Sequence, residues 1–237
     1  MAIAYAASAV ASEPPTRGPS ASRLPAPSSV AFQDAAPPYG LPFAGPPGPS
    51  TWYVSQAYGN TVYAYFERRG LYASGQGVHF GLDIAAPCGT PVVAIGDGVV
   101  RSVDGPGGSP PHNLAVDHPD GRVSFYGHLM SRPPVNVGQP VKRGEPIALS
   151  GDMFGTCYSS PHLHLEIRDR SMSRLENPIP LIDADWNRIV LLGASSPTFE
   201  RDLAEPERWQ TFADQPGVTL GGGLLNDYSR PWPSDGW

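Results

Sequence analysis

The sequence predicts a mainly β fold built from short antiparallel strands. Apolar and alternating runs of four to six residues follow one another between residues 91 and 168, and Gly, Pro, Asn and Asp are clustered between them. Strands that are this short and this closely spaced are typical of antiparallel sheets. The sequence shows neither an internal repeat nor a heptad pattern. An antiparallel β domain is therefore the expected fold class.

The individual elements can be assigned in chain order. The predicted strands span residues 91–95, 98–103, 114–117, 123–126, 146–150 and 163–168. Residues 105–111 contain three Gly and three Pro and predict a loop. The segment His118-Pro119-Asp120-Gly121 predicts a hairpin turn, in which Gly121 supplies a positive φ. Residues 137–145 are also rich in turn residues, and the pattern over 199–213 allows a helix interrupted at Pro206.

Composition divides the chain into three parts. Residues 1–50 contain 11 of the 29 Pro together with much Ala, Ser and Gly, which predicts a leader and a flexible segment. The expected folded domain spans residues 51–176, and an acidic extension without an assignable role spans 177–237. Near the start, Ala9-Val10-Ala11 resembles the end of a signal peptide that lacks its basic region, with an Ala-rich flexible start as the alternative. We therefore expect a secreted or cell-envelope protein.

Charge and hydropathy argue against two kinds of partner. The net charge is −6 at pH 7 and the Lys and Arg residues are not clustered, which argues against nucleic-acid binding. No apolar run approaches the roughly 20 residues that a membrane-spanning helix needs. The only two cysteines, Cys88 and Cys157, would form one disulfide in an exported chain or remain two buried thiols, and the sequence leaves both possibilities open. A monomer is the expected oligomeric state.

Four of the six histidines lie in three compact motifs. These are His79-Phe80-Gly81-Leu82-Asp83, Tyr126-Gly127-His128-Leu129 and His162-Leu163-His164-Leu165-Glu166. Residues two apart on a strand share a face, so we expect His162 and His164 to project together while the intervening leucines turn into the core. Two adjacent imidazoles suit a metal ligand beside a catalytic base, because neutral imidazole nitrogen binds zinc and titrates near neutral pH.

The same motifs predict a metal site. His79 and Asp83 are four residues apart, share a face in an extended segment, and offer one nitrogen and one oxygen ligand. One histidine of the later pair would complete a set of three protein ligands. A zinc ion held by three protein ligands keeps its fourth position for water, as catalytic zinc sites do.

Taken together, the motifs resemble those of the lysostaphin-like zinc metalloendopeptidases of bacterial cell-wall metabolism, whose catalytic domain is of the LytM type. The resemblance runs from about Val78 to Ile167 and includes further segments in the same order. These are Ile84-Ala85-Ala86-Pro87, Gly89-Thr90-Pro91-Val92, Gly98-Val99-Val100 and Val141-Lys142-Arg143-Gly144.

The resemblance implies a small antiparallel β-sheet sandwich, built as a duplicated hybrid motif with a narrow groove and with irregular N- and C-terminal extensions. It implies one Zn²⁺ ion bound by His79, Asp83 and His164. His162 would act as general acid–base on a metal-activated water and His128 would stabilise the oxyanion, unless these roles are exchanged or shared. The implied activity is hydrolysis of the stem or bridge peptides that cross-link bacterial peptidoglycan.

Several alternatives remain beside this hypothesis. A non-catalytic member of the same fold would bind cell wall or activate a partner amidase, and an enzyme could be held latent by its N-terminal segment. We expect Glu166 to support the site rather than to bind the metal. The aromatic residues before His79 would either line the groove or belong to the core. His112 and His118 are expected to be structural or exposed.

Overall fold

The computed structural model describes residues 36–190, 199–202 and 204–228, which belong to one compact unit. The predicted end of a signal peptide and most of the predicted flexible N-terminal segment lie outside these residues. Within them, no helix is both long enough and apolar enough to span a bilayer.

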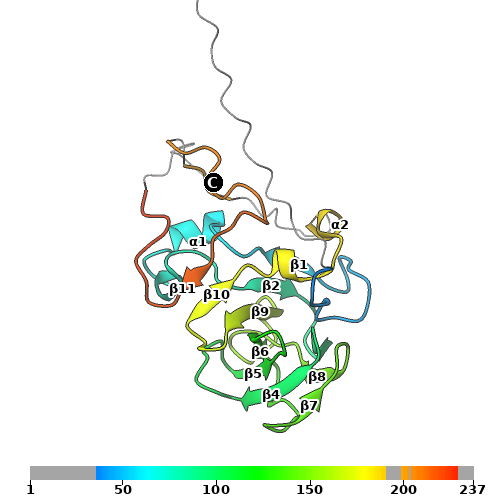
Figure 1. Ribbon diagram of the computed structural model, residues 1–237. Coiled ribbons are helices and arrows are strands. Elements are labelled where there is room, and N and C mark those ends of the chain that lie inside the picture. Colours follow the sequence, from blue (N-terminus) through cyan, green and yellow to red (C-terminus); the bar gives the residue numbers. More distant parts are fainter. Residues whose placement is uncertain (1–35, 191–198, 203, 229–237) are drawn as a thin grey trace, which may run out of the picture. The chain divides into compact units, whose positions relative to one another are not determined.

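Strands dominate the described part of the chain (Figure 1). They are β1 (Tyr53–Gln56), β2 (Leu82–Ala85), β3 (Pro91–Val93), β4 (Gly98–Val103), β5 (His112–Asp117), β6 (Arg122–Leu129), β7 (Pro140–Val141), β8 (Pro146–Leu149), β9 (His162–Asp169), β10 (Arg174–Glu176) and β11 (Val218–Thr219). The helices are short: α1 (Val62–Phe66), α2 (Trp186–Val190) and 3₁₀ turns at Ala73–Gly75 and Ile179–Leu181.

The strands form two antiparallel sheets. The larger sheet has nine strands among the described residues, in the order β1-β2-β9-β6-β5-β4-β7, with β10 paired to β9 and to β11. The smaller sheet pairs β3 with β8. The prediction of a mainly antiparallel β fold is therefore confirmed, and each of the six predicted strands corresponds to an observed one.

The central strand β9 carries one face into the core and the other into a cleft. Leu163 and Leu165 are fully buried in the main apolar cluster. His162 and His164 line the cleft on the other face, as the alternation of a strand requires. The register places His164 opposite Asp83 of β2 on one side and opposite Gly127 of β6 on the other. Pairing of distant segments on β9 therefore brings the histidine motifs together.

The prediction that residues 1–50 form a flexible segment is wrong for residues 36–50. Tyr39 and Phe43 are only 2% and 4% exposed and belong to the main core. The Tyr39 hydroxyl also donates to Asp120 over 2.8 Å, and the Gly40 N–H donates to the Ile95 carbonyl over 2.7 Å. A segment rich in Pro is thus fixed by two buried aromatic anchors, which composition averaged over fifty residues did not show.

The prediction that residues 199–213 could form an interrupted helix is also wrong. The described residues of this stretch form turns and irregular structure. Asp202 accepts the N–H groups of Ala204 and Glu205, which favours a local turn over helix propagation. Pro206 follows directly and cannot donate a hydrogen bond within a helix.

Candidate metal centre

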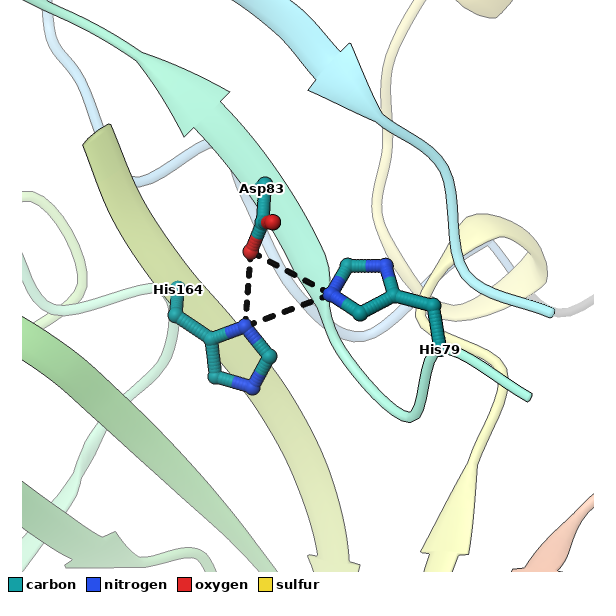
Figure 2. A group of neighbouring side chains, drawn as sticks. All are labelled: His79, Asp83 and His164. Carbon is teal, nitrogen blue, oxygen red and sulfur yellow. Dashed lines mark hydrogen bonds and ion pairs between the residues drawn. The ribbon is translucent and has the colours of Figure 1, made fainter. Parts of the chain in front are cut away.

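Three side chains converge where β2, β9 and the loop before β2 meet (Figure 2). His164 Nδ1 lies 2.6 Å from Asp83 Oδ1, and His79 Nε2 lies 3.3 Å from the same oxygen. The two imidazole nitrogens, His79 Nε2 and His164 Nδ1, are 3.4 Å apart. One potential ligand atom from each residue thus lies within 4.8 Å of the others. The structure brings together the three predicted metal ligands.

The spacing of these atoms fits a zinc ion. Zn–N and Zn–O bonds of about 2.0–2.1 Å in a tetrahedral site place neighbouring ligand atoms roughly 3.3 Å apart. The two distances from His79 Nε2 have this length, whereas the 2.6 Å contact between His164 and Asp83 is a hydrogen bond that a cation would replace. Nitrogen and carboxylate donors together suit zinc better than magnesium or calcium, which prefer oxygen ligands.

In each of the two imidazoles, the contact made by one ring nitrogen decides that the other nitrogen faces the centre. His79 Nδ1 lies 2.8 Å from the Ala57 carbonyl, which only accepts, so Nδ1 carries the proton and Nε2 keeps its lone pair. His164 is turned the other way, with Nε2 3.1 Å from Glu166 Oε1 and Nδ1 toward Asp83. Gly81 leaves room for this ring, because a Cβ there would lie 2.4 Å from His164 Cε1.

The carboxylates of Asp83 and Glu166 make the centre attractive to a cation. Burial alone would raise the pKa of Asp83, but His79 and His164 outweigh it and hold that pKa well below its ordinary value. Burial would likewise lower the pKa of His164, yet Asp83 and Glu166 raise it to about 10. A proton and a metal ion therefore compete for the lone pair of His164 Nδ1.

Glu166 holds the His164 ring on the side away from Asp83. The carboxylate is fully buried, accepts from His164 Nε2 and forms an ion pair with Arg168. Arg168 in turn donates to the Gly107 carbonyl over 3.0 Å, and its guanidinium stacks 4.4 Å from the centre of the Phe125 ring. The expectation that Glu166 supports the site agrees with these contacts.

Two further histidines stand beside the three candidate ligands. His162 Nδ1 lies 2.7 Å from the Ser160 carbonyl, and its Nε2 lies 3.9 Å from Asp83 Oδ2. His128 Nδ1 lies 2.6 Å from the Pro110 carbonyl, and its ring centre lies 4.9 Å from that of His162. Because carbonyls only accept, both neutral rings carry their proton on Nδ1 and have a bare Nε2.

His128 is also distinguished by its backbone and its pKa. Its φ of 57° lies in the left-handed region, which is uncommon for residues other than glycine and is found preferentially at functional sites. Burial, reinforced by the neighbouring His164 and His162, lowers its pKa to about 4. A pKa this low favours the neutral ring near pH 7.

The five side chains open into one cleft of about 700 Å³. Tyr53, Tyr63 and Tyr72 line it, whereas Trp52 and Tyr58 are buried in the core. The aromatic residues before His79 thus divide between the two predicted locations. The remaining lining residues are Ser55, Gln56, Leu71, Phe80, Ala85, Ser109, Pro110, Met153, Ser160 and Pro161.

A disulfide-linked loop forms the approach to His162. Cys88 and Cys157 are joined, which resolves the alternative that the sequence left open. Within this loop, the buried Asp152 accepts from Phe154 N, from Thr156 N and Oγ1, and from Ser159 N. The loop ends at Ser160, whose carbonyl holds His162.

The other two histidines lie outside the cleft. His112 is partly exposed and lies 3.0 Å from Asp104. His118 is buried, and its ring contacts the Asp97 carbonyl and the Ser124 hydroxyl, each over 2.8 Å. Both have structural contacts, as expected.

Sequence reasoning missed the groups that orient the histidines. Most are backbone carbonyls, of Ala57, Pro110 and Ser160, and a carbonyl leaves no mark in the residue types. Asp152 carried a usable signal, because Asp side chains at the start of turns commonly accept hydrogen bonds from N–H groups of the residues that follow.

Residues 77–177 match the model of Peptidase family M23. We call residues 77–177 the M23 region. The M23 region contains the three candidate ligands as well as His128 and His162, and the resemblance to lysostaphin-like peptidases is confirmed.

The curated relatives match over this same part of the chain. Peptidoglycan DD-endopeptidase ShyA of Vibrio cholerae is 37% identical over 108 residues, which cover 44% of this chain and 24% of ShyA. An uncharacterized metalloprotease of Haemophilus influenzae is 38% identical over 104 residues, covering 43% of this chain and 21% of that protein. The chain therefore spans less than a quarter of the length of either relative.

A solved structure is also similar. The catalytic domain of the antimicrobial peptidase lysostaphin from Staphylococcus simulans is 30% identical, with 44% of this chain and 78% of that chain covered and a TM-score of 0.38.

Proposed function

We propose that this chain is a zinc-dependent endopeptidase that hydrolyses the peptide cross-links of bacterial peptidoglycan. The observation that carries the proposal is the convergence of His79, Asp83 and His164 at zinc-ligand spacing, beside two imidazoles with bare Nε2 atoms. The M23 match and the relatives named as peptidoglycan endopeptidases support the substrate class. Such a substrate places the protein outside the cytoplasm, secreted or in the cell envelope, and we propose that it acts as a monomer.

His79 Nε2, Asp83 Oδ1 and His164 Nδ1 would hold one Zn²⁺ ion. When bound, the ion would supply Lewis acidity that polarises the scissile carbonyl and lowers the pKa of water toward about 7. Glu166 and the Ala57 carbonyl keep the two imidazoles in the tautomers that ligation needs.

His162 is proposed as the general base and later the general acid. Its Nδ1–H is engaged by the Ser160 carbonyl, so Nε2 is free to take a proton from the attacking water. The protonated ring can then deliver that proton to the leaving amine. The 3.9 Å separation of Nε2 from Asp83 Oδ2 places this atom beside the ligand set.

His128 can donate to an oxyanion only when its ring carries a second proton. In the neutral ring Nδ1–H is bound to Pro110, and Nε2 is an acceptor. With ring centres 4.9 Å apart, we propose that His128 and His162 share one proton during the cycle. The ring that holds the proton donates, and the other ring accepts.

The test combines metal content with chemistry on purified peptidoglycan. The pure full-length protein should contain about one Zn²⁺ per chain and release new amino groups from cross-linked peptidoglycan. Removal of Zn²⁺ with a chelator should abolish release, and added Zn²⁺ should restore it. Mass spectrometry of the released muropeptides would identify the bond that is cut.

A non-catalytic wall-binding protein is the competing result. It would sediment with peptidoglycan and release no amino groups, whether or not it bound zinc. That outcome would reject the enzymatic proposal.

A further inference from the structure

His79 depends on a short neighbouring segment for its position. The Gly59 N–H donates to the His79 carbonyl over 2.7 Å, and the His79 N–H donates to the Gly59 carbonyl over 2.8 Å. The ring is fixed in addition by the hydrogen bond from Nδ1 to the Ala57 carbonyl. The backbone and the tautomer of this candidate ligand are therefore both set by residues 57–59.

The next residue, Asn60, is bound by the C-terminal part of the chain through all its polar groups. Its N–H donates to Gln215 Oε1 over 2.8 Å, and its carbonyl accepts the Glu200 N–H over 3.0 Å. Its side-chain amide donates to the Tyr228 hydroxyl and accepts from Asn226 Nδ2, the latter over 2.7 Å. We call Glu200, Gln215, Asn226 and Tyr228 the C-terminal clamp.

Asn226 also reaches the other side of the Gly59–His79 pair. It is fully buried, and its Nδ2 donates over 2.7 Å to the carbonyl of Gly77, two residues before His79. A Cβ on Gly77 would lie 2.2 Å from Asn226 Oδ1, and a Cβ on Gly59 would lie 2.1 Å from Gln215 Oε1. The clamp therefore packs against both backbone segments that hold His79, with no space between them.

We propose that the C-terminal clamp is a positioning element of the metal centre. It fixes Asn60 and Gly77, and through them the placement of His79 Nε2 toward Asp83 and His164. This inference rests on the proposed function, because it takes His79 as a zinc ligand. The clamp residues lie beyond the M23 region, which ends at residue 177, so the C-terminal extension completes a site whose ligands all lie within that region.

The energetic basis is the burial of the amides. Asn60, Gln215 and Asn226 are 1%, 4% and 0% exposed. A buried donor or acceptor that loses its partner destabilises the fold, so the network favours one arrangement of the loop. Without the clamp, Gly59 and His79 would keep their local hydrogen bonds, but Asn60 and Gly77 would no longer be fixed from the C-terminal side, and His79 would sample other positions.

The test compares two buried asparagines in the full-length protein. Asn226→Ala removes the two hydrogen bonds that the Asn226 amide donates, to Asn60 and to Gly77. Asn177→Ala is the matched control, because Asn177 is 7% exposed and also holds the C-terminal part, by donating to the Phe212 carbonyl over 2.6 Å. Zn²⁺ affinity is measured by competition with a chromogenic chelator, and ligand geometry by the absorption spectrum of the Co²⁺-substituted protein. Both are recorded well below the melting temperature of each variant.

Only the clamp variants should change Zn²⁺ affinity and the Co²⁺ spectrum. Asn226→Ala should weaken Zn²⁺ binding roughly 10-fold and shift the Co²⁺ absorption bands, as loss of an outer contact to a ligand does. Asn177→Ala should lower the melting temperature but leave affinity and spectrum unchanged. If Asn226→Ala does not fold, Tyr228→Phe removes only the hydroxyl that binds Asn60 and should produce a smaller change in the same direction.

Three outcomes would overturn the inference. Wild-type affinity and an unchanged Co²⁺ spectrum in the folded clamp variants would show that His79 does not need the clamp. Equal weakening by Asn177→Ala would reduce the effect to general stability. A wild-type protein that binds no Zn²⁺ would reject the proposed metal centre itself, and with it the clamp.

Discussion

Single carbonyl contacts set the chemistry of the centre. His79, His128 and His162 each have Nδ1 within 2.8 Å of a backbone carbonyl, which leaves Nε2 without a proton in the neutral ring. His164 differs because Glu166 holds its Nε2, so Nδ1 is the nitrogen that faces Asp83. The tautomers therefore distinguish one imidazole that presents Nδ1 to the centre from three that present Nε2.

His162→Ala should separate zinc binding from turnover. The substitution removes the proposed base but none of the three proposed metal ligands, so we expect the Zn²⁺ content to remain near one per chain. General acid–base catalysis contributes about 10²–10⁴-fold, so kcat should fall by at least about 100-fold. Metal analysis and amine release from peptidoglycan would be measured on the same preparation.

His112→Ala is the control for that experiment. His112 is partly exposed, pairs with Asp104 and lies outside the cleft, so its removal should leave both quantities unchanged. A His162→Ala protein with wild-type activity would assign the proton transfer to another group.

At this scale the sequence predicted which residues meet but not how they are oriented. His79, Asp83, His128, His162 and His164 do lie together, because their motifs could be recognised from residue type and spacing. The nitrogen that each ring presents depends on carbonyls such as those of Pro110 and Ser160, which the fold brings into place. Residue types alone carry no information about such contacts.

The loop that ends at Ser160 is held by one carboxylate. Asp152 is enclosed by four hydrogen bonds from Phe154, Thr156 and Ser159. Burial would raise its pKa, but these donors outweigh burial and lower the pKa to about 2. Because the folded pKa lies below the value of about 3.9 expected in the unfolded chain, the charged form favours the folded state.

This shift predicts how the loop responds to acid. The stabilisation from Asp152 should be complete above about pH 4, decline as the pH falls, and disappear once the pH has passed below about 2. Asp152→Asn should therefore be less stable than wild type at pH 6, and the difference in melting temperature should shrink between pH 4 and pH 2. Thermal unfolding followed by circular dichroism would measure it.

Asp227→Asn controls for the loss of a negative charge, because Asp227 forms an exposed ion pair with Arg69. Its difference from wild type should stay small across the range, as exposed pairs contribute little. A constant difference between wild type and Asp152→Asn down to pH 2 would contradict the role given to the carboxylate.

Among the elements, the strands with a strong local pattern were predicted and the short paired ones were not. β4 occupies its predicted residues, β5 and β9 extend at most two residues beyond either end of theirs, and β6 continues past its predicted end to Leu129. β2 has four residues and contains Asp83, a poor strand former, so it exists by pairing with β1 and β9. β7 and β11 have two residues each, too few for any alternation to be read.

At the scale of the whole molecule, the core extends beyond the domain that composition indicated. The main apolar cluster includes Tyr39 and Phe43 from before residue 51, together with Ile179, Ile182 and Ile189 from after residue 176. Their side chains pack against core strands of the sheet, and the Tyr39 backbone also pairs with Leu181 and Asp183. The N- and C-terminal flanks thus form part of one core with the M23 region.

This shared core predicts that a fragment of residues 51–176 will not fold as the longer chain does. It lacks those five buried side chains, each worth about 1.5–3 kcal/mol, and their sum is comparable to the whole net stability of a domain, about 5–15 kcal/mol. It also lacks the C-terminal clamp. A fragment of residues 36–228 keeps both and is the matched comparison. We expect cooperative thermal unfolding and Zn²⁺ binding from residues 36–228, and a broad transition with little Zn²⁺ binding from residues 51–176. Equal melting temperatures for the two fragments would mean that the flanks only cover a core that is already complete.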